Sequence, residues 1–206
     1  MTHTGEETSR HATTVRLFYG VFVDEALRES VVRLQERLHV PGPRIKWVER
    51  QNLHFTLRFI GDTPGSRVPE FVAAGRAAAA ACPSFDMQTQ GAGAFPSPAN
   101  PQTIWLGATA GAEAMIELHR ALSDVLANEA LAEPEDRAFV PHCTLGRVRQ
   151  GRGRRREYRR LAEAIEAEAE TEIGAMRCAE FCLISSTLAS SGPQYETVAR
   201  CTLPNQ

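Results

Sequence analysis

The pattern His-x-Thr-Leu occurs twice in this chain, at His54–Leu57 and again at His142–Leu145. The two histidines are 142 − 54 = 88 residues apart. Both copies lie in stretches where polar and apolar side chains alternate, which is typical of a half-buried β-strand. The chain therefore places the same polar pair on two strands. This favours a fold built from two related halves whose motifs face one cleft.

The segments around the two motifs follow each other in the same order. Helices are expected where apolar residues recur every three or four positions, and strands where β-branched and aromatic residues cluster. Asp24 is placed to cap the first helix. In chain order, we expect a strand at 15–23, a helix at 25–38, the strand with His54, a helix at 68–81, a strand from Phe85, a strand at 103–109, a helix at 112–130, a strand at 142–148, a helix at 156–170, and strands at 178–189 and 195–203. This order predicts an internal duplication of strand–helix–strand–helix–strand, of the α/β or α+β class.

The length and composition fit one domain. The chain has 206 residues, of which 43% are hydrophobic, enough for one sizeable core. Residues 1–14 are polar and are expected to form a disordered tail. Residues 15–206 are then a single domain with two intimately packed lobes, roughly 15–95 and 102–206. The Gly- and Pro-rich residues 91–102 are expected to form a loop between them.

Alternation along the first motif strand assigns its side chains to two faces. His54, Thr56 and Arg58 share one face, because side chains two residues apart point the same way. The apolar residues between them, and Phe59 after them, are expected to face the core. This leaves a histidine, a hydroxyl and a guanidinium together on the opposite surface.

The second motif strand has a similar polar face. His142 and Thr144 share it with Gly146, whose missing side chain would let a ligand or a backbone approach closely. Strict alternation points Arg147 to the other face. Twist or a bulge near the strand end would re-aim it, so geometry alone supports Arg58 more than Arg147 as a site residue.

Two histidines and two hydroxyls suit the displacement of an oxygen at a phosphodiester. Histidine titrates near neutral pH, so one imidazole can act as a base while another acts as an acid. Threonine hydroxyls can donate to the non-bridging phosphoryl oxygens, and arginine adds a charged, bidentate donor. A metal site is not expected, since neither motif strand carries an aspartate or glutamate. A single His-x-Thr is more often a structural feature; the repeat favours function.

The bulk composition excludes several classes. A net charge of −2 argues against a general nucleic-acid coat protein, so any contact with nucleic acid must come from a local patch. No apolar run approaches the ~18 residues that span a membrane. The five cysteines lack paired metal-binding spacings and are expected to be reduced thiols of a cytoplasmic protein.

One basic segment and several aromatic residues have two readings each. Residues 147–160 concentrate arginines before an acidic helix. They could follow an RNA backbone, or form a solvated loop neutralised by the helix, and we favour the second reading. Phe18, Phe95 and Tyr195 could stack on a terminal base, although packing in the core or between the lobes is the more common role.

At these residues the chain resembles the two-histidine (2H) phosphoesterase superfamily, and within it the RNA 2′,3′-cyclic phosphodiesterases, historically called 2′-5′ RNA ligases. The resemblance covers nearly the whole chain. Five stretches carry it in order: RLFYGVFV, WVERQNLHFTLRFIGD, GAGAFPSPANPQTIWLG, FVPHCTLGRV and SGPQYE. Thr187 and Cys143 depart from the residue types usual in that family, and Thr187 leaves the substrate preference open.

The resemblance implies a fold and a set of roles. The fold would be α+β, with bilobal, duplicated lobes related by pseudo-two-fold symmetry around a central groove. His54 would donate the proton to the leaving oxygen and His142 would accept the proton from water. Phosphate would be held by Thr56, Thr144, Arg58 and Arg147. No metal or cofactor is implied, and a cytoplasmic monomer is expected.

The implied reaction opens a terminal 2′,3′-cyclic phosphate on RNA to leave a 2′-phosphate. Its reverse, with a 5′-hydroxyl in place of water, would ligate RNA through a 2′-5′ linkage. Two alternatives stay open. The substrate could be a small cyclic nucleotide or a 2′-5′ linked oligonucleotide, or the protein could bind RNA or nucleotides without catalysis.

Overall fold

Apolar and aromatic residues of TVRLFYGVF build the first strand of a single large sheet in the computed structural model, which describes residues 13–135, 137–149, 155–189 and 192–205. The described strands are β1 (Thr14–Phe22), β2 (Ile45–Trp47), β3 (His54–Pro64), β4 (Phe85–Ser97), β5 (Asn100–Ala108), β6 (His142–Val148), β7 (Glu172–Cys178), β8 (Glu180–Ala189) and β9 (Gly192–Thr202). The helices are α1 (Glu25–Arg37), α2 (Val68–Ala80), α3 (Ala112–Asn128) and α4 (Arg155–Ala167). The expected mixture of strands and helices is confirmed as an α+β fold.

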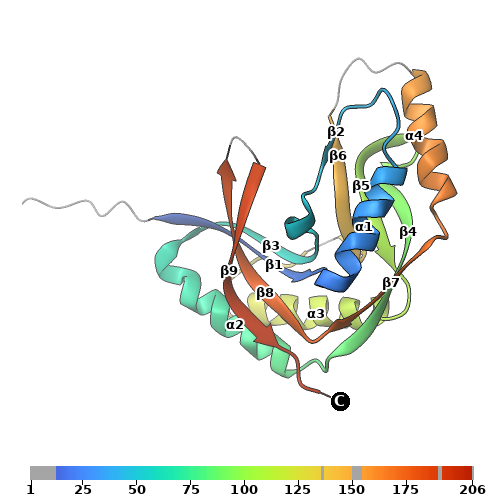
Figure 1. Ribbon diagram of the computed structural model, residues 1–206. Coiled ribbons are helices and arrows are strands. Elements are labelled where there is room, and N and C mark those ends of the chain that lie inside the picture. Colours follow the sequence, from blue (N-terminus) through green and yellow to red (C-terminus); the bar gives the residue numbers. More distant parts are fainter. Residues whose placement is uncertain (1–12, 136, 150–154, 190–191, 206) are drawn as a thin grey trace, which may run out of the picture.

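The sheet is antiparallel and curled. Its strands follow the order β7-β4-β5-β6-β3-β1-β8-β9, and β2 pairs with part of β6. Figure 1 shows β8 and β9 beside β1 and β3 on one side, and β4, β5 and β6 on the other. The two strands that carry the His-x-Thr motifs, β3 and β6, are therefore neighbours at the middle of the sheet.

The strand order cuts across the lobe boundary expected from chain order. β4 belongs to the first half of the sequence but pairs with β5 and β7. The strands β8 and β9 end the chain but join the sheet through β1. Lobes of 15–95 and 102–206 thus do not correspond to the two sides of this sheet, because each side draws strands from both halves of the sequence.

The residues between the expected lobes form a hairpin rather than a loop, and that expectation was wrong. β4 continues to Ser97 and β5 begins at Asn100. Pro96 is tolerated because β7 pairs only with Phe85–Gln90 of β4, which leaves the later part of β4 with a free edge. The expected tail at 1–14 lies outside the described residues except for residues 13 and 14, of which Thr14 begins β1.

Local signals explain where the helices begin. The Asp24 side chain accepts a hydrogen bond of 2.8 Å from the backbone N–H of Leu27, which confirms Asp24 as the cap of α1. The helix α3 starts after Gly111, whose φ of +80° suits glycine. A Cβ atom there would lie 2.3 Å from the carbonyl oxygen of Asp86. Among the described residues, no helix is both long and apolar enough to cross a membrane.

Candidate active site

The two motifs meet where β3 and β6 pair. The pair is antiparallel, with Phe55 opposite Cys143 and both side chains fully buried. This register sets His54 opposite Thr144 and Thr56 opposite His142, and residues opposite each other share a face of the sheet. The structure thus brings both histidines and both threonines together on one surface.

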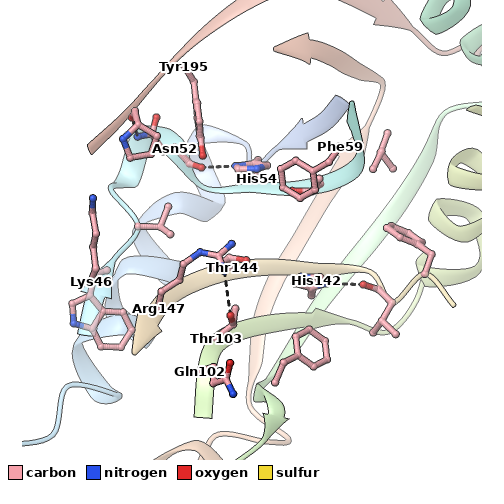
Figure 2. Close-up of a pocket in the computed structure, with 18 of the residues that line it drawn as sticks. Lys46, Asn52, His54, Phe59, Gln102, Thr103, His142, Thr144, Arg147 and Tyr195 are labelled. Atoms are coloured by element: carbon pink, nitrogen blue, oxygen red, sulfur yellow. Dashed lines mark hydrogen bonds between the residues drawn. The ribbon is translucent and has the colours of Figure 1, made fainter. Parts of the chain in front are cut away.

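These four side chains line a pocket with a volume of about 870 Å³. Its walls are built by β2, β3 and β6, by the β4–β5 hairpin, by the loop before β6, and by the start of β9. Figure 2 shows His54 on β3 and His142 on the neighbouring strand β6, which also carries Arg147. The volume lies in the usual range for small-molecule sites, roughly 300–1,000 Å³.

Each imidazole is held by one backbone carbonyl. His54 Nδ1 lies 2.6 Å from the carbonyl oxygen of Asn52, and His142 Nδ1 lies 2.7 Å from that of Val140. A carbonyl oxygen only accepts hydrogen bonds, so Nδ1 carries the proton in both rings. In the neutral imidazole Nε2 then keeps its lone pair, and this is the atom available for proton transfer.

The surroundings of both histidines favour the neutral form. Burial lowers the pKa of His54 below the ordinary 6.5, and the positive charges of His142 and Arg147 lower it further, while the bond to Asn52 acts in the opposite direction. Burial also lowers the pKa of His142, and Arg147 adds to this effect. A bound phosphate anion would offset the charge of Arg147 and raise both pKa values.

Aromatic rings pack against both imidazoles. The ring of Phe18 lies 5.0 Å from that of His54, and Tyr195 meets the same imidazole edge-on at 5.4 Å. Phe95 meets His142 edge-on at 5.1 Å. The three aromatic residues considered for base stacking therefore pack against the histidines.

A β-bulge lies at the leucine of the motif on each strand. In β3, Thr56 pairs with Gly20 and Arg58 with Tyr19, so Leu57 is the additional residue. In β6, Thr144 pairs with Trp105 and Gly146 with Ile104, so Leu145 is the additional residue. A bulge interrupts the alternation of side chains. The residues after it therefore face opposite to the expectation on both strands.

The bulge in β3 reverses the expected positions of Phe59 and Arg58. Phe59 was expected in the core, but its side chain is 60% exposed and lines the pocket. Arg58 was expected beside His54 and Thr56, but it is buried and is not among the described residues that line the pocket. Both placements were wrong, because strict alternation does not continue past Leu57.

Arg58 is held by the loop that precedes β6. Its Nη1 lies 2.5 Å from Glu135 Oε2, and its Nη2 donates a hydrogen bond to the carbonyl oxygen of Glu133. Glu135 Oε2 also lies 3.3 Å from Nε2 of His119. The guanidinium that was expected to bind phosphate thus contacts this loop. No motif in the sequence indicated that contact.

The bulge in β6 has the opposite consequence for Arg147. Alternation pointed it away from the motif face, but it lines the pocket and its Nη1 donates to Thr103 Oγ1 at 3.3 Å. Gly146 does not admit a ligand: a Cβ atom there would lie 2.8 Å from Ile45 and 2.8 Å from Trp47. The missing side chain instead makes room for the residues of β2.

Sequence reasoning missed further polar residues of the pocket. Lys46, the single lysine of the chain, lies at one end, and Gln102 and Thr103 contribute from β5. None of the three belongs to a repeated motif. Of the basic segment 147–160, residues 150–154 lie outside the described part of the chain.

One pocket is lined by two imidazoles with free Nε2 atoms, by the hydroxyls of Thr56 and Thr144, and by Arg147. Together these groups define an acid–base site for a phosphate ester. The chain belongs to the 2′-5′ RNA ligase superfamily, whose family model matches residues 23–188. The similarity to RNA 2′,3′-cyclic phosphodiesterases that the motifs indicated is thereby confirmed.

Curated relatives match along most of their length. A Methanothermobacter thermautotrophicus protein named RNA 2′,3′-cyclic phosphodiesterase is 36% identical over 181 residues, 88% of this chain and 95% of that protein. An Aquifex aeolicus protein of the same name is 30% identical over 186 residues, 89% of this chain and 95% of its own.

Solved structures share the fold. The Thermus thermophilus protein TT0787 superposes with a TM-score of 0.75 at 26% identity, covering 93% of this chain and 99% of its own. E. coli LigT in its apo form gives a TM-score of 0.69 at 22% identity, with 93% and 99% covered. At that identity the likeness to LigT concerns the fold alone.

Proposed function

We propose that this protein is an RNA 2′,3′-cyclic phosphodiesterase, which hydrolyses a terminal 2′,3′-cyclic phosphate to a 2′-phosphate. The observation that carries the proposal is the pairing of His54 and His142 across one pocket, each with Nδ1 tied to a carbonyl oxygen and Nε2 left for chemistry. A relative that is 36% identical carries the name of this activity.

The proposed reaction needs two proton transfers in opposite directions. His142 Nε2 takes a proton from water while the water oxygen bonds to phosphorus. The bond from phosphorus to the 3′ oxygen breaks, and His54 Nε2 donates its proton to that oxygen. His54 must therefore be protonated in the complex, and the bound anion favours this form. A 5′-hydroxyl in place of water would break the same bond from phosphorus to the 3′ oxygen and would leave a 2′-5′ linkage.

Neutral and charged donors would hold the phosphate. Thr56 and Thr144 lie opposite the two histidines and offer hydroxyl donors to the non-bridging oxygens. Arg147 supplies the positive charge. This charge is close enough to the site to lower the pKa of both histidines. The proposal needs no metal or cofactor. Arg58 is left out of this set because its guanidinium contacts Glu135.

We further propose that residues 15–206 form one domain whose two motif-bearing strands derive from a duplication, with pseudo-two-fold symmetry between them. The support is local: both His-x-Thr-Leu motifs are followed by a bulge at the leucine. A monomeric, cytoplasmic enzyme is proposed, and five free cysteines fit a reducing compartment.

The test is incubation of the protein with a short RNA ending in a 2′,3′-cyclic phosphate, with EDTA present. The wild type is expected to form the 2′-phosphate, which 31P NMR distinguishes from the 3′ isomer. His54→Ala and His142→Ala are expected to bind the RNA but to convert it about 10²–10⁴ times more slowly. Equal binding by all three proteins with no turnover by the wild type would reject the enzyme in favour of a binding protein.

A further inference from the structure

Two positive charges lie side by side at one end of the pocket. Lys46 of β2 is the cross-strand partner of Arg147 of β6, and both side chains line the pocket. On the other side of β6, Arg147 pairs with Thr103 of β5. Thr103, Arg147 and Lys46 thus form one polar row across three neighbouring strands, and Figure 2 shows Lys46 at its outer end, beyond Arg147 from His142.

The two like charges repel each other. Like charges directly opposite each other on neighbouring strands destabilise a sheet. Within the described parts of the chain, neither Lys46 nor Arg147 has a carboxylate within 4 Å of its charged group. The pocket's two carboxylates have other partners: Gln51 donates to Glu49, and Arg58 contacts Glu135. The row is therefore suited to anions.

Arg147 and Lys46 would serve different anions. Arg147 is close enough to the histidines for its charge to lower the pKa of both. Lys46 lies one strand farther out, and neighbouring strands are about 4.8 Å apart. Its ammonium reaches toward the start of β9, where a Cβ atom on Gly192 would lie 3.4 Å from Nζ. A phosphate held between the histidines would thus leave Lys46 available for a second one.

We propose that Lys46 forms a second phosphate subsite, which binds the 5′ phosphate group of the terminal nucleotide of the substrate. A nucleotide with a 2′,3′-cyclic phosphate carries its only other phosphate on the 5′ oxygen. In an RNA end that group is the phosphodiester to the preceding nucleotide. The enzyme then prefers RNA ends over nucleoside 2′,3′-cyclic phosphates. This inference rests on the proposed function of the same pocket.

Three substrates test whether the subsite binds a 5′-monophosphate or the phosphodiester to a preceding nucleotide. They are a nucleoside 2′,3′-cyclic phosphate, the same compound with a 5′-monophosphate, and a dinucleotide with a 2′,3′-cyclic end. The ratio of kcat/KM for either 5′-phosphorylated substrate to that for the nucleoside is expected to be about tenfold or more in the wild type. A high ratio for the dinucleotide alone would assign the subsite to the phosphodiester.

Three variants test the role of Lys46. Lys46→Met is expected to lower the kcat/KM ratio about tenfold, while Lys46→Arg keeps it. Arg44→Met removes an exposed positive charge two residues away, outside the described pocket lining, and is expected to leave the ratio unchanged. An unchanged ratio in Lys46→Met, or an equal fall with Arg44→Met, would overturn the subsite.

A binding measurement keeps the two proposals distinguishable. The dissociation constant of a dinucleotide ending in a 2′-phosphate is expected to rise about tenfold in Lys46→Met, and that of a nucleoside 2′-phosphate to change far less. Equal weakening for both ligands would overturn the subsite. A wild type that binds both but hydrolyses none of the substrates would count against the proposed function instead.

Discussion

At the scale of single residues, the two imidazoles of this site are made nearly equivalent by their surroundings. Each donates through Nδ1 to a carbonyl oxygen two residues before it in the chain, and each has a pKa lowered chiefly by burial. Their contacts alone do not divide the acid role from the base role. The assignment of His54 as donor and His142 as acceptor is carried by the resemblance to the family and remains a prediction.

The lowered pKa values predict the pH dependence of the free enzyme. Activity requires one neutral and one protonated histidine, so kcat/KM is bell-shaped and falls below the lower pKa and above the higher one. Since both lie below 6.5, the maximum is expected on the acid side of pH 6.5. Arg147→Met removes a charge that lowers both values, so its profile moves to higher pH.

Steady-state kinetics across pH 4–9 would measure these profiles, with Arg149→Met as the control because Arg149 is exposed and lies outside the described pocket lining. A wild-type maximum well above pH 6.5, or a profile of Arg147→Met that moves to lower pH, would contradict this view of the electrostatics.

At the scale of elements, the bulges decide which residues join the site. Alternation correctly placed His54, Thr56, His142 and Thr144 on one face, because all four precede the additional leucine of their strand. It failed for Arg58, Phe59, Gly146 and Arg147, which follow that leucine. A bulge depends on how a partner strand pairs, here β1 and β5, and one strand's own sequence does not contain that information.

Arg58, which was expected in the pocket, instead contacts the loop before β6. Its partners in that loop are Glu133 and Glu135. The loop also contains Val140, whose carbonyl oxygen accepts the hydrogen bond from His142. His119 contacts Glu135 and stacks on Phe139 of the same loop at 4.2 Å. We therefore expect Arg58 to position the loop that orients His142.

Replacing Arg58 by methionine is therefore expected to lower kcat about 10- to 100-fold, because small displacements of a catalytic group are costly. It should also speed tryptic cleavage after Arg137, in the same loop. Glu135→Gln should show both effects, and the double variant should be no worse than either single one.

Arg67→Met is the control, since Arg67 lies at the surface, half-buried, and pairs with Glu70 there. A role of Arg58 as a phosphate ligand would give another result. Phosphate affinity would then fall in Arg58→Met while cleavage after Arg137 stayed at the wild-type rate.

At the scale of the whole molecule, one core joins both sides of the sheet. Buried residues of β1, β3 and β8 belong to the same cluster as those of β4, β5 and β6. The types of most elements were predictable because their periodicity is local, although the strands β2 and β7 were not expected. Their partners were not: β8 and β9 return to β1 from the far end of the chain, and β7 returns to pair with β4.

The continuous core predicts how the cysteines react. Burial raises the pKa of Cys143 and Cys178 to about 12 and that of Cys201 to about 11, whereas Cys82 is only partly buried. In the folded protein N-ethylmaleimide is expected to modify Cys82 first and Cys143 only on global unfolding. Mass spectrometry along a urea series would follow this. Modification of Cys143 at the rate of Cys82 in buffer would indicate that β3 and β6 separate in the native state.

His54 and His142 are proposed to act together on one phosphate. The most direct test is the single-turnover rate on an RNA with a 2′,3′-cyclic end, measured for His54→Ala, His142→Ala and the double variant. Each single variant is expected to lose about 10²–10⁴ in rate. The double variant should lose little more, because residues that act as a unit are not additive. Losses that multiply in the double variant, or a single variant that keeps most of its activity, would contradict the two-histidine site.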